Sequence, residues 1–321
     1  MDNGNGRRRT IALRDLTLRE GLDTPGVTFS GSQAVRITTM LAAAGIREAE
    51  IVAPARVADG LGIARRLRER GVRIKTSGLV YAASRDRTRE IAAVQSHLDR
   101  FDLLMPLSPK RDPRKPRAKI ATLLEALALV EPPLAAVGVG FPHATQVDPS
   151  FLMEISTAAV DAGATRVTIY DTNGSADPFA IKSLIARLTR RIAAPVYFHG
   201  HNDLGLATAN SLAAALGGAK GLDVTVNGLG DRAGNASLEQ VAVGLIARGW
   251  RVGADPGRLR ELSQLVATAS GVSVSKLAPV VGEFVFAHRS PAHLPVPAEF
   301  EAFAPKLIGA RRRLERRGSA R

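Results

Sequence analysis

An eightfold alternation of short β-like runs with helix-length segments is the feature that most constrains the fold. The first run is TIALRDLTL (10–18), and seven more follow at 46–52, 72–80, 97–105, 134–141, 165–171, 195–200 and 222–228. Amphipathic stretches such as SQAVRITTMLAAAG (32–45) lie between the runs. Strands that alternate with helices indicate a parallel sheet. Eight such units in about 240 residues match the count and size of a (β/α)8 barrel, a TIM barrel of the α/β class.

An open, doubly wound sheet is the alternative architecture, but no G-x-G-x-x-G motif follows the first run. The glycine-rich VGVGFP (137–142) leads into a proline and lacks the third glycine. The alternation stops near residue 250, where a helix-like segment ends at a glycine and a proline-punctuated region follows. We therefore expect four parts: a basic tail at 1–9, the barrel at 10–255, a short and mainly helical C-terminal subdomain at 256–309, and an Arg-rich tail at 310–321.

Composition excludes several classes of protein. No apolar run approaches the 18 residues of a membrane span, and the polar, basic N-terminus is unlike a secretory signal. The absence of cysteine rules out disulfides, a thiolate nucleophile and a cysteine-ligated zinc site. We expect a cytoplasmic protein that does not bind membranes.

The net charge of +14 raises the question of nucleic-acid binding. Most of this charge lies in three stretches, 1–10, 108–119 and 307–321, which leaves the body of the chain near neutral. Few aromatic residues lie among these charges to stack on bases. Solvated tails, or a general attraction of anionic ligands, explain the charge better than a nucleic-acid partner.

The stretch FHGHNDLGLATAN (198–210) places two histidines at the end of the seventh run. Residues i and i+2 of a strand point to the same side, and the reactive face of a TIM barrel lies at the carboxyl ends of its strands. His199 and His201 can therefore reach one metal ion, although a histidine pair is also found as a purely structural feature.

Two other run ends offer oxygen ligands at the same face. Glu20 follows the first run, beside Arg19, which would serve as a cation for a substrate carboxylate; a surface Arg–Glu pair is the alternative interpretation. Asn235 follows the eighth run in NGLGDRAGNAS (227–237). Nitrogen, carboxylate and amide ligands with open positions suit Mg²⁺, Mn²⁺, Zn²⁺ or Fe(II). No nucleophilic triad is visible.

Three long motifs in order resemble signatures of the DRE-TIM metallolyase (HMGL-like) superfamily: DLTLREGLDTPGVTFS, FHGHNDLGLATANSLAAALGGA and VTVNGLGDRAGNASLEQV. The most similar branch is that of the homocitrate, isopropylmalate and citramalate synthases. The resemblance extends over 10–309, because APVVGEFVFAHRSPAHL and FEAFAPKLIG are similar to the subdomain that follows the barrel in those enzymes.

The resemblance implies a divalent metal, a 2-oxo acid substrate, an acyl-CoA co-substrate and a homodimer. The metal chelates the 2-oxo acid, a deprotonated acyl-CoA methyl attacks its carbonyl carbon, and thioester hydrolysis drives release. The implied metal residues are Glu20, His199 and His201, with Asn235 near the site and a direct ligand in the lyase branch. The implied substrate residues are Arg19 on the 2-oxo acid and its enolate-like oxygen, Glu50 in the substrate pocket, and Thr172 on the carboxylate.

The chain also departs from the family pattern. Asp23 stands where the family has a glutamine, so that a carboxylate faces the substrate in place of an amide. On the fifth strand, FPHATQVD replaces a Glu-Asp-x-x-Arg pattern, which places Pro142 or His143 at the glutamate and Gln146 at the arginine.

The C-terminal subdomain departs as well. His293 matches a histidine that the synthases link to the catalytic base, but the nearby tyrosine is Phe300 and HESG is HRSP. The base for the acyl-CoA methyl is therefore not assigned by the resemblance. His143 and His293 are the two candidates, and each is equally consistent with a packed or solvated histidine.

Three functions follow from these observations. The first is a metal-dependent condensation of an acyl-CoA with a 2-oxo acid, with a non-standard substrate. The second is the reverse chemistry, a lyase or aldolase that cleaves a 2-hydroxy acid, which the altered fifth strand favours. The third is a catalytically inactive barrel that acts as a binding protein, which the intact set of metal ligands disfavours.

Overall fold

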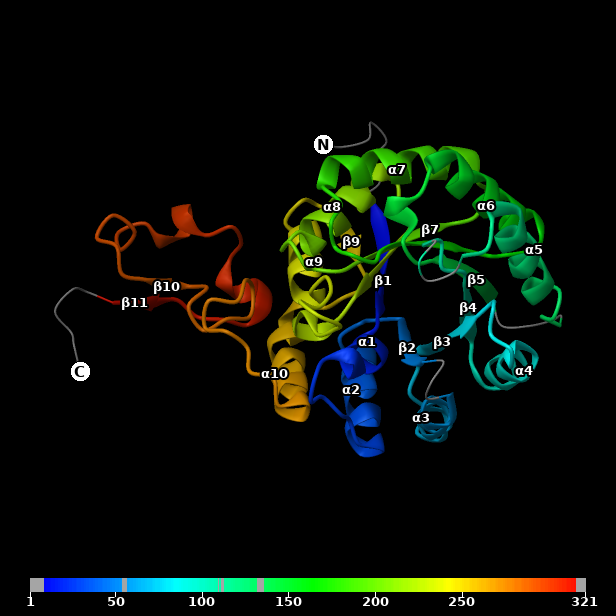
Figure 1. Ribbon diagram of the computed structural model, residues 1–321. Coiled ribbons are helices and arrows are strands. Elements are labelled where there is room, and N and C mark those ends of the chain that lie inside the picture. Colours follow the sequence, from blue (N-terminus) through cyan, green and yellow to red (C-terminus); the bar gives the residue numbers. More distant parts are fainter. Residues whose placement is uncertain (1–8, 54–56, 109, 111–112, 132–135, 316–321) are drawn as a thin grey trace.

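Eight parallel strands close into a barrel in the computed structural model, which describes residues 9–53, 57–108, 110, 113–131 and 136–315 (Figure 1). β1 closes the barrel because it pairs with β2 on one side, Arg14 opposite Glu48, and with β8 on the other, Ala12 opposite Gly221. The predicted TIM barrel is confirmed. Its strands are β1 (Thr10–Asp15), β2 (Glu48–Val52), β3 (Lys75–Tyr81), β4 (Arg100–Leu104), β5 (Ala136–Phe141), β6 (Val167–Asp171), β7 (Val196–Gly200) and β8 (Gly221–Val224).

The first run is shorter as a strand than its apolar pattern predicts. β1 ends at Asp15, and a short helix, α1 (Thr17–Glu20), follows together with the 3-10 turn η1 (Gly21–Asp23). Asp15 ends the strand because its carboxylate accepts hydrogen bonds from both the backbone N–H and the hydroxyl of Thr17. This turn places Arg19 and Glu20 above the carboxyl end of β1.

Helices surround the barrel on its outside (Figure 1). Local sequence signals define their ends. Ser30 and Gln33 form a capping box on the second helix, and Asp148 and Asp177 cap two helices whose first residue is proline. The helices are α2 (Gly31–Ala43), α3 (Val57–Glu69), α4 (Arg87–His97), α5 (Pro116–Leu127), α6 (Pro149–Asp161), α7 (Pro178–Arg191), α8 (Ala207–Gly217) and α9 (Leu238–Ile246).

The two faces of each strand differ in chemistry, as β2 shows. Ala49 and Ile51 join the apolar core between the strands and the helices. Glu48 and Glu50 alternate with them and point into the barrel, where both are buried and paired with arginines. The outer layer is therefore apolar, whereas the barrel interior contains charged side chains.

Gly138 on β5 makes room for this charged interior. A Cβ atom there would lie 2.1 Å from Oδ1 of Asp102 and 2.6 Å from Cγ of Arg166. Any side chain at position 138 would thus displace the Asp102–Arg166 ion pair, in which Nε and Oδ1 are 2.8 Å apart.

The C-terminal region is less helical than expected. After the strand β9 (Arg251–Val252), which pairs with β1, and the turn η5 (Pro256–Arg258), its one α-helix in the described chain is α10 (Leu259–Ser270), which contacts α2 and the turn η4 (Val226–Gly228). The reason is that prolines interrupt 278–309 at five positions, and proline cannot donate a helical hydrogen bond. The segment instead forms η6 (Pro297–Phe300), η7 (Pro305–Ile308) and a two-stranded pair of β10 (Ala287–His288) and β11 (Arg313–Leu314).

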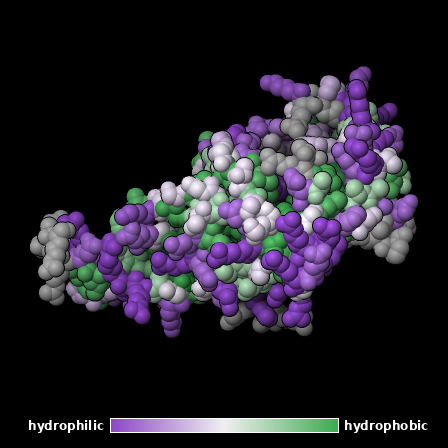
Figure 2. All heavy atoms as spheres, turned by 90° about the horizontal axis from the view of Figure 1, so that it is seen from below, coloured by the Kyte–Doolittle hydropathy of each residue, from purple (hydrophilic) through white to green (hydrophobic). Residues whose placement is uncertain are grey.

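This C-terminal segment extends away from the barrel beyond α10 (Figure 1). The space-filling view shows it as a narrow projection from the body of the molecule, with hydrophilic side chains spread over the visible face (Figure 2). No helix within the described ranges is both long and apolar enough to cross a bilayer.

Candidate active site

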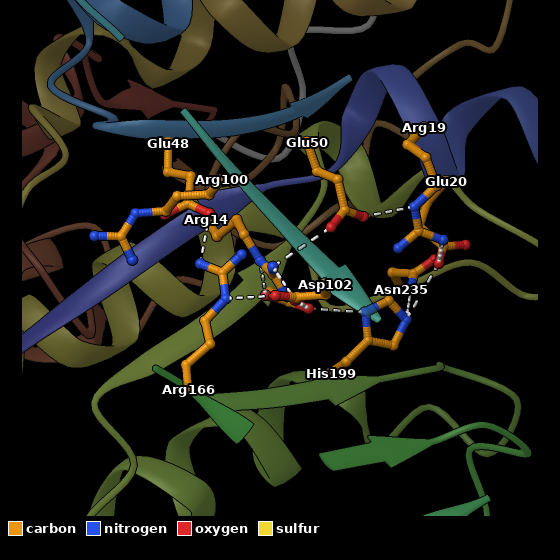
Figure 3. Close-up of polar contacts among 11 residues, drawn as sticks. Arg14, Arg19, Glu20, Glu48, Glu50, Arg100, Asp102, Arg166, His199 and Asn235 are labelled. Carbon is orange, nitrogen blue, oxygen red and sulfur yellow. Dashed lines mark hydrogen bonds and ion pairs between the residues drawn. The ribbon is translucent and has the colours of Figure 1, made fainter. Parts of the chain in front are cut away.

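Glu20, His199 and His201 converge at the carboxyl end of the barrel. Oε1 of Glu20 lies 3.3 Å from Nε2 of His199, and the two Nε2 atoms of the histidines are 3.3 Å apart. One potential ligand atom from each residue lies within 4.8 Å of the others, and all three side chains are buried. Figure 3 shows Glu20 and His199 directed toward each other from α1 and β7. The structure therefore brings together the three ligands predicted from the motifs.

A hydrogen bond on the far side of the ring orients His199. Its Nδ1 lies 3.1 Å from Oδ2 of Asp223 on β8, while the ring of Tyr170 on β6 stacks on it with centroids 4.3 Å apart. With Nδ1 bonded to a carboxylate, Nε2 keeps its lone pair toward Glu20. A carboxylate behind a histidine is the usual support of a metal ligand.

The charge states of the cluster suit a cation. Burial, together with the neighbouring His199, lowers the pKa of His201 to about 3, so its ring is neutral and one of its two nitrogens carries a free lone pair. Burial alone would raise the pKa of Glu20, but Arg19 and the two histidines more than offset it and lower that pKa. The neutral imidazole of His201 and the ionised carboxylate of Glu20, with Nε2 of His199 beside them, fit a divalent metal.

Asn235 lies at the edge of the same cluster. Its Nδ2 is 3.0 Å from Nε2 of His199, and its backbone forms a bridge with His201. Its Oδ1 is buried and has no hydrogen-bond partner among the described residues. Gly230 is needed opposite this amide, because a Cβ atom there would lie only 1.8 Å from Oδ1 of Asn235.

Arg19 lies next to Glu20 and pairs with two carboxylates. It contacts Oε1 of Glu20 directly, and its Nε donates to Oε1 of Glu50 at 2.7 Å. Its Nη2 is buried and has no partner within the described chain. Glu50 is fully buried and also lies 3.4 Å from Nη1 of Arg14. Glu50 therefore positions Arg19 and leaves the Nη2 amino group of its guanidinium available to a ligand.

Thr172 and His143 lie together where β5 and β6 end. The backbone N–H of His143, a residue with φ of 65°, donates to the Thr172 hydroxyl at 2.8 Å. The His143 ring is half-buried, with Nδ1 3.0 Å from Oε1 of Gln146. Arg232 fixes the Thr172 loop, since its Nη2 donates to the Thr172 carbonyl at 2.7 Å and also pairs with Asp203.

Comparison with known proteins agrees with this geometry. The HMGL-like family model matches residues 10–266, which include the barrel and every site residue described above. The chain belongs to the HMGL-like family.

Named relatives of this HMGL-like chain are synthases. It is 34% identical to homocitrate synthase 1 of Nostoc sp. over 313 residues, which cover 95% of this chain and 82% of the relative. It is 32% identical to 2-isopropylmalate synthase 2 of Caldanaerobacter subterraneus subsp. tengcongensis, with 95% and 81% covered. The crystal structure of hydroxymethylglutaryl-CoA lyase from Pseudomonas aeruginosa shares the fold, with a TM-score of 0.74, 18% identity, and 85% and 97% of the two chains covered.

Two predicted residues of the HMGL-like chain lie outside the cluster. Asp23 ends η1 with an exposed side chain. His293 lies in the C-terminal projection, where its ring stacks on Phe300 with centroids 3.8 Å apart and its Nδ1 is 3.4 Å from Nδ1 of His288. His293 therefore lies in the segment between β10 and β11, which extends away from the barrel (Figure 1).

The HMGL-like barrel contains an ion-pair network below the site that the sequence did not reveal. Arg14 donates to both carboxylate oxygens of Asp223 at 2.7 and 2.8 Å, and to Asp102 at 2.7 Å. Asp102 pairs in turn with Arg166, whose Nη1 lies 2.6 Å from Glu48 (Figure 3). The one local signal is that these charged residues occur within the predicted strand runs, and this signal does not show which of them pair.

Tyr170 was also missed. Its position in VTIYD predicted only a strand residue, yet its ring contacts His199 and its hydroxyl is buried without a partner in the part of the chain that the structure describes. Burial raises the pKa of Tyr170 well above its usual value.

Proposed function

We propose that this chain is a divalent-metal-dependent acyltransferase that condenses an acyl-CoA with a 2-oxo acid. The observation that carries the proposal is the buried Glu20–His199–His201 cluster with Arg19 beside it at the barrel mouth. Relatives named homocitrate and 2-isopropylmalate synthases, matched over most of their length, support the reaction class. Cytoplasmic location and the identity of the metal remain predictions.

The residues of this chain divide the work as follows. Glu20, His199 and His201 would hold the cation, which when bound supplies Lewis-acid polarisation of the 2-oxo acid. The free Nη2 of Arg19 donates to the substrate oxygen that gains charge. The Thr172 hydroxyl, which accepts a hydrogen bond from the His143 backbone, keeps its own proton to donate to the carboxylate of the 2-oxo acid.

His143 is the base that we propose for the acyl-CoA methyl, because the end of β5 places it beside Thr172. His293 is the second candidate, and it reaches a barrel mouth only if the C-terminal projection of one subunit covers the barrel of another. We therefore expect a homodimer if His293 acts. Replacing each histidine by alanine distinguishes the two: the base variant loses turnover but keeps 2-oxo acid binding, whereas the other retains turnover.

A thiol-release assay tests the proposed function directly. Since the chain has no cysteine, a disulfide reagent such as DTNB reports only the thiol of free CoA. Protein loaded with Mg²⁺, Mn²⁺ or Zn²⁺ is incubated with acetyl-, propionyl- or malonyl-CoA and a panel of 2-oxo acids. We expect thiol release that requires both substrates and disappears in His199→Ala. Release without a 2-oxo acid, or none with any pair, contradicts the proposal.

A lyase is the second candidate. Asn235 favours it, because the resemblance makes an asparagine at this position a direct metal ligand in the lyase branch. The unpartnered Oδ1 of Asn235 gives the cluster a possible fourth ligand, since the amide O and N atoms exchange places by a simple flip. The test is release of a 2-oxo acid from 2-hydroxy acids by the metal-loaded protein. A protein that binds 2-oxo acids but catalyses neither reaction would be the inactive binding barrel.

A further inference from the structure

Tyr170 lies inside the barrel mouth, beside a metal-ligand candidate. It is 5% exposed, and its ring stacks on that of His199 with an interplanar angle of 27°. It belongs to a small apolar cluster, separate from the main core, with Leu79 of β3 and Leu104 of β4, against which Tyr81 also packs. The phenol ring therefore contacts His199 of the Glu20–His199–His201 cluster, and it also packs against the aliphatic side chains of Leu79 and Leu104.

The hydroxyl of Tyr170 has no hydrogen-bond partner within the described residues. Four other buried polar atoms of the site residues are in the same condition, namely Nη2 of Arg19, Oε2 of Glu50, Nδ1 of His201 and Oδ1 of Asn235. Buried polar atoms are nearly always hydrogen-bonded in native proteins, so several unsatisfied atoms around one site indicate a missing polar ligand. The phenol and the guanidinium donate hydrogen bonds, and so does Nδ1 of His201 when its Nε2 faces the cluster.

The Tyr170 ring also limits the space at the mouth. Gly140 on β5 lies beneath it, where a Cβ atom would be 2.9 Å from Cε2 of Tyr170 and 2.5 Å from Cδ2 of Leu104. The ring and Leu104 thus fill the space that a larger residue at 140 would need. The side chains that pack against the ring, Leu79 and Leu104, are aliphatic, and the one polar atom of Tyr170 is its hydroxyl.

We propose that Tyr170 determines specificity for the 2-oxo acid: its hydroxyl donates a hydrogen bond to the bound 2-oxo acid, and its ring restricts that substrate to a short aliphatic side chain. The inference rests on the proposed function for the class of substrate. It adds the residue that contacts the substrate and the side chains that fit, from glyoxylate and pyruvate to 2-oxobutyrate.

Equilibrium binding tests this inference without requiring turnover. Isothermal titration calorimetry on the Mn²⁺-loaded full chain, without acyl-CoA, gives the Kd of glyoxylate, pyruvate, 2-oxobutyrate, 2-oxoisovalerate and 2-oxoglutarate. We expect the short aliphatic acids to bind about tenfold or more tightly than 2-oxoglutarate. Tyr170→Phe keeps the ring and should weaken their binding about tenfold, or about 1.4 kcal/mol, with unchanged Mn²⁺ affinity. Tyr170→Ala should bind the branched 2-oxoisovalerate more tightly than pyruvate.

The matched control is Tyr197→Phe. Tyr197 lies on β7 with its ring near Arg14 and Arg166 and not beside the histidine cluster, so its variant should keep the wild-type Kd values. Unchanged 2-oxo acid binding in Tyr170→Phe, or a wild-type protein that binds none of the panel, overturns the inference. Wild-type binding that responds to Tyr170→Phe, combined with no thiol release, upholds the inference and rejects the condensation.

Discussion

The Nδ1 atom of His199 lies 3.1 Å from Oδ2 of Asp223, and this contact determines which nitrogen of the histidine faces Glu20. Asp223 also accepts two hydrogen bonds from Arg14, so its carboxylate is held in place from both sides. Arg14 and the bond to His199 lower the pKa of Asp223 despite its burial, which keeps it ionised.

Asp223→Asn should therefore weaken metal binding. The amide lacks the charge that holds His199 in one tautomer, and the loss of such a supporting carboxylate typically costs 10–100-fold in metal affinity. Competition with a chelator of known affinity measures the Kd for Zn²⁺ or Mn²⁺, and circular dichroism checks folding. Asp161→Asn, an exposed substitution at the end of α6, is the control. Equal metal affinity in the folded Asp223→Asn protein would show that the tautomer needs no carboxylate.

Asp15 should make the unfolding free energy depend on pH. Burial raises its pKa from 3.8 to about 7, although the two hydrogen bonds from Thr17 act in the opposite direction. Between about pH 4 and pH 7 the folded state holds a proton that the unfolded chain has released. Stability is therefore lost as the pH rises through this window, by up to about 1.4 kcal/mol per pH unit from this group.

Asp15→Asn isolates this effect, because asparagine resembles the protonated acid and does not titrate. Urea unfolding at pH 5 and pH 8 measures both proteins. We expect wild type to lose more stability than the variant between the two pH values. An identical loss in both would mean that Asp15 is already ionised in the folded protein at pH 5.

Arg232 should affect the affinity for the 2-oxo acid and not the affinity for metal. Its guanidinium joins Asp203 to the carbonyl of Thr172, and its φ of 56° shows a backbone conformation unusual for a residue with a side chain. Arg232→Ala frees the Thr172 loop, so we expect KM for the 2-oxo acid to rise about tenfold. Arg232→Lys should not restore it, because a lysine cannot bond to both partners in the same planar geometry. A wild-type KM in the alanine variant would rule out this positioning role.

Gly230→Ala should displace Asn235, whose Oδ1 is 1.8 Å from the added Cβ. Gly163→Ala is a matched control, because Gly163 has φ of 101° but nothing within 4 Å of its Cβ position. We expect the control to lose about 1 kcal/mol of stability from backbone strain alone. Gly230→Ala should lose about 1–3 kcal/mol from the steric clash and bind metal more weakly. Similar metal affinity in the two variants would show that Asn235 does not contribute to metal binding.

The barrel and the metal cluster were predictable because both depend on local patterns. Alternating runs identify the strands, and the carboxyl ends of parallel strands meet at one face, so His199 and Glu20 could be placed together without a structure. The helix α1 was not predicted because its first two residues, Thr17 and Leu18, continue the pattern of the first run, and the Asp15–Thr17 hydrogen bonds that end the strand are not visible in the sequence.

The charged interior could not be predicted in this way. Arg14 and Asp223 are separated by 209 residues, and Arg14 and Asp102 by 88, so no local pattern pairs them. Tyr170 gave no signal for a similar reason, since a tyrosine in a strand is ordinary and only the fold places its ring on His199. The helix content of the C-terminal region was overestimated from one amphipathic segment, although its prolines were visible.

The ion pairs inside the barrel form one continuous chain that runs from the carboxyl end of the strands to their amino end. From His199 the contacts pass through Asp223, Arg14, Asp102, Arg166 and Glu48 to Arg100, whose side chain is 27% exposed at the amino end of β4. From Asp223 onward, charges of opposite sign alternate along this path, and every one of these side chains except that of Arg100 is buried. The candidate metal site is thus connected to the opposite, solvent-facing end of the barrel by a continuous chain of salt bridges and hydrogen bonds, where a purely apolar barrel interior would separate the two ends.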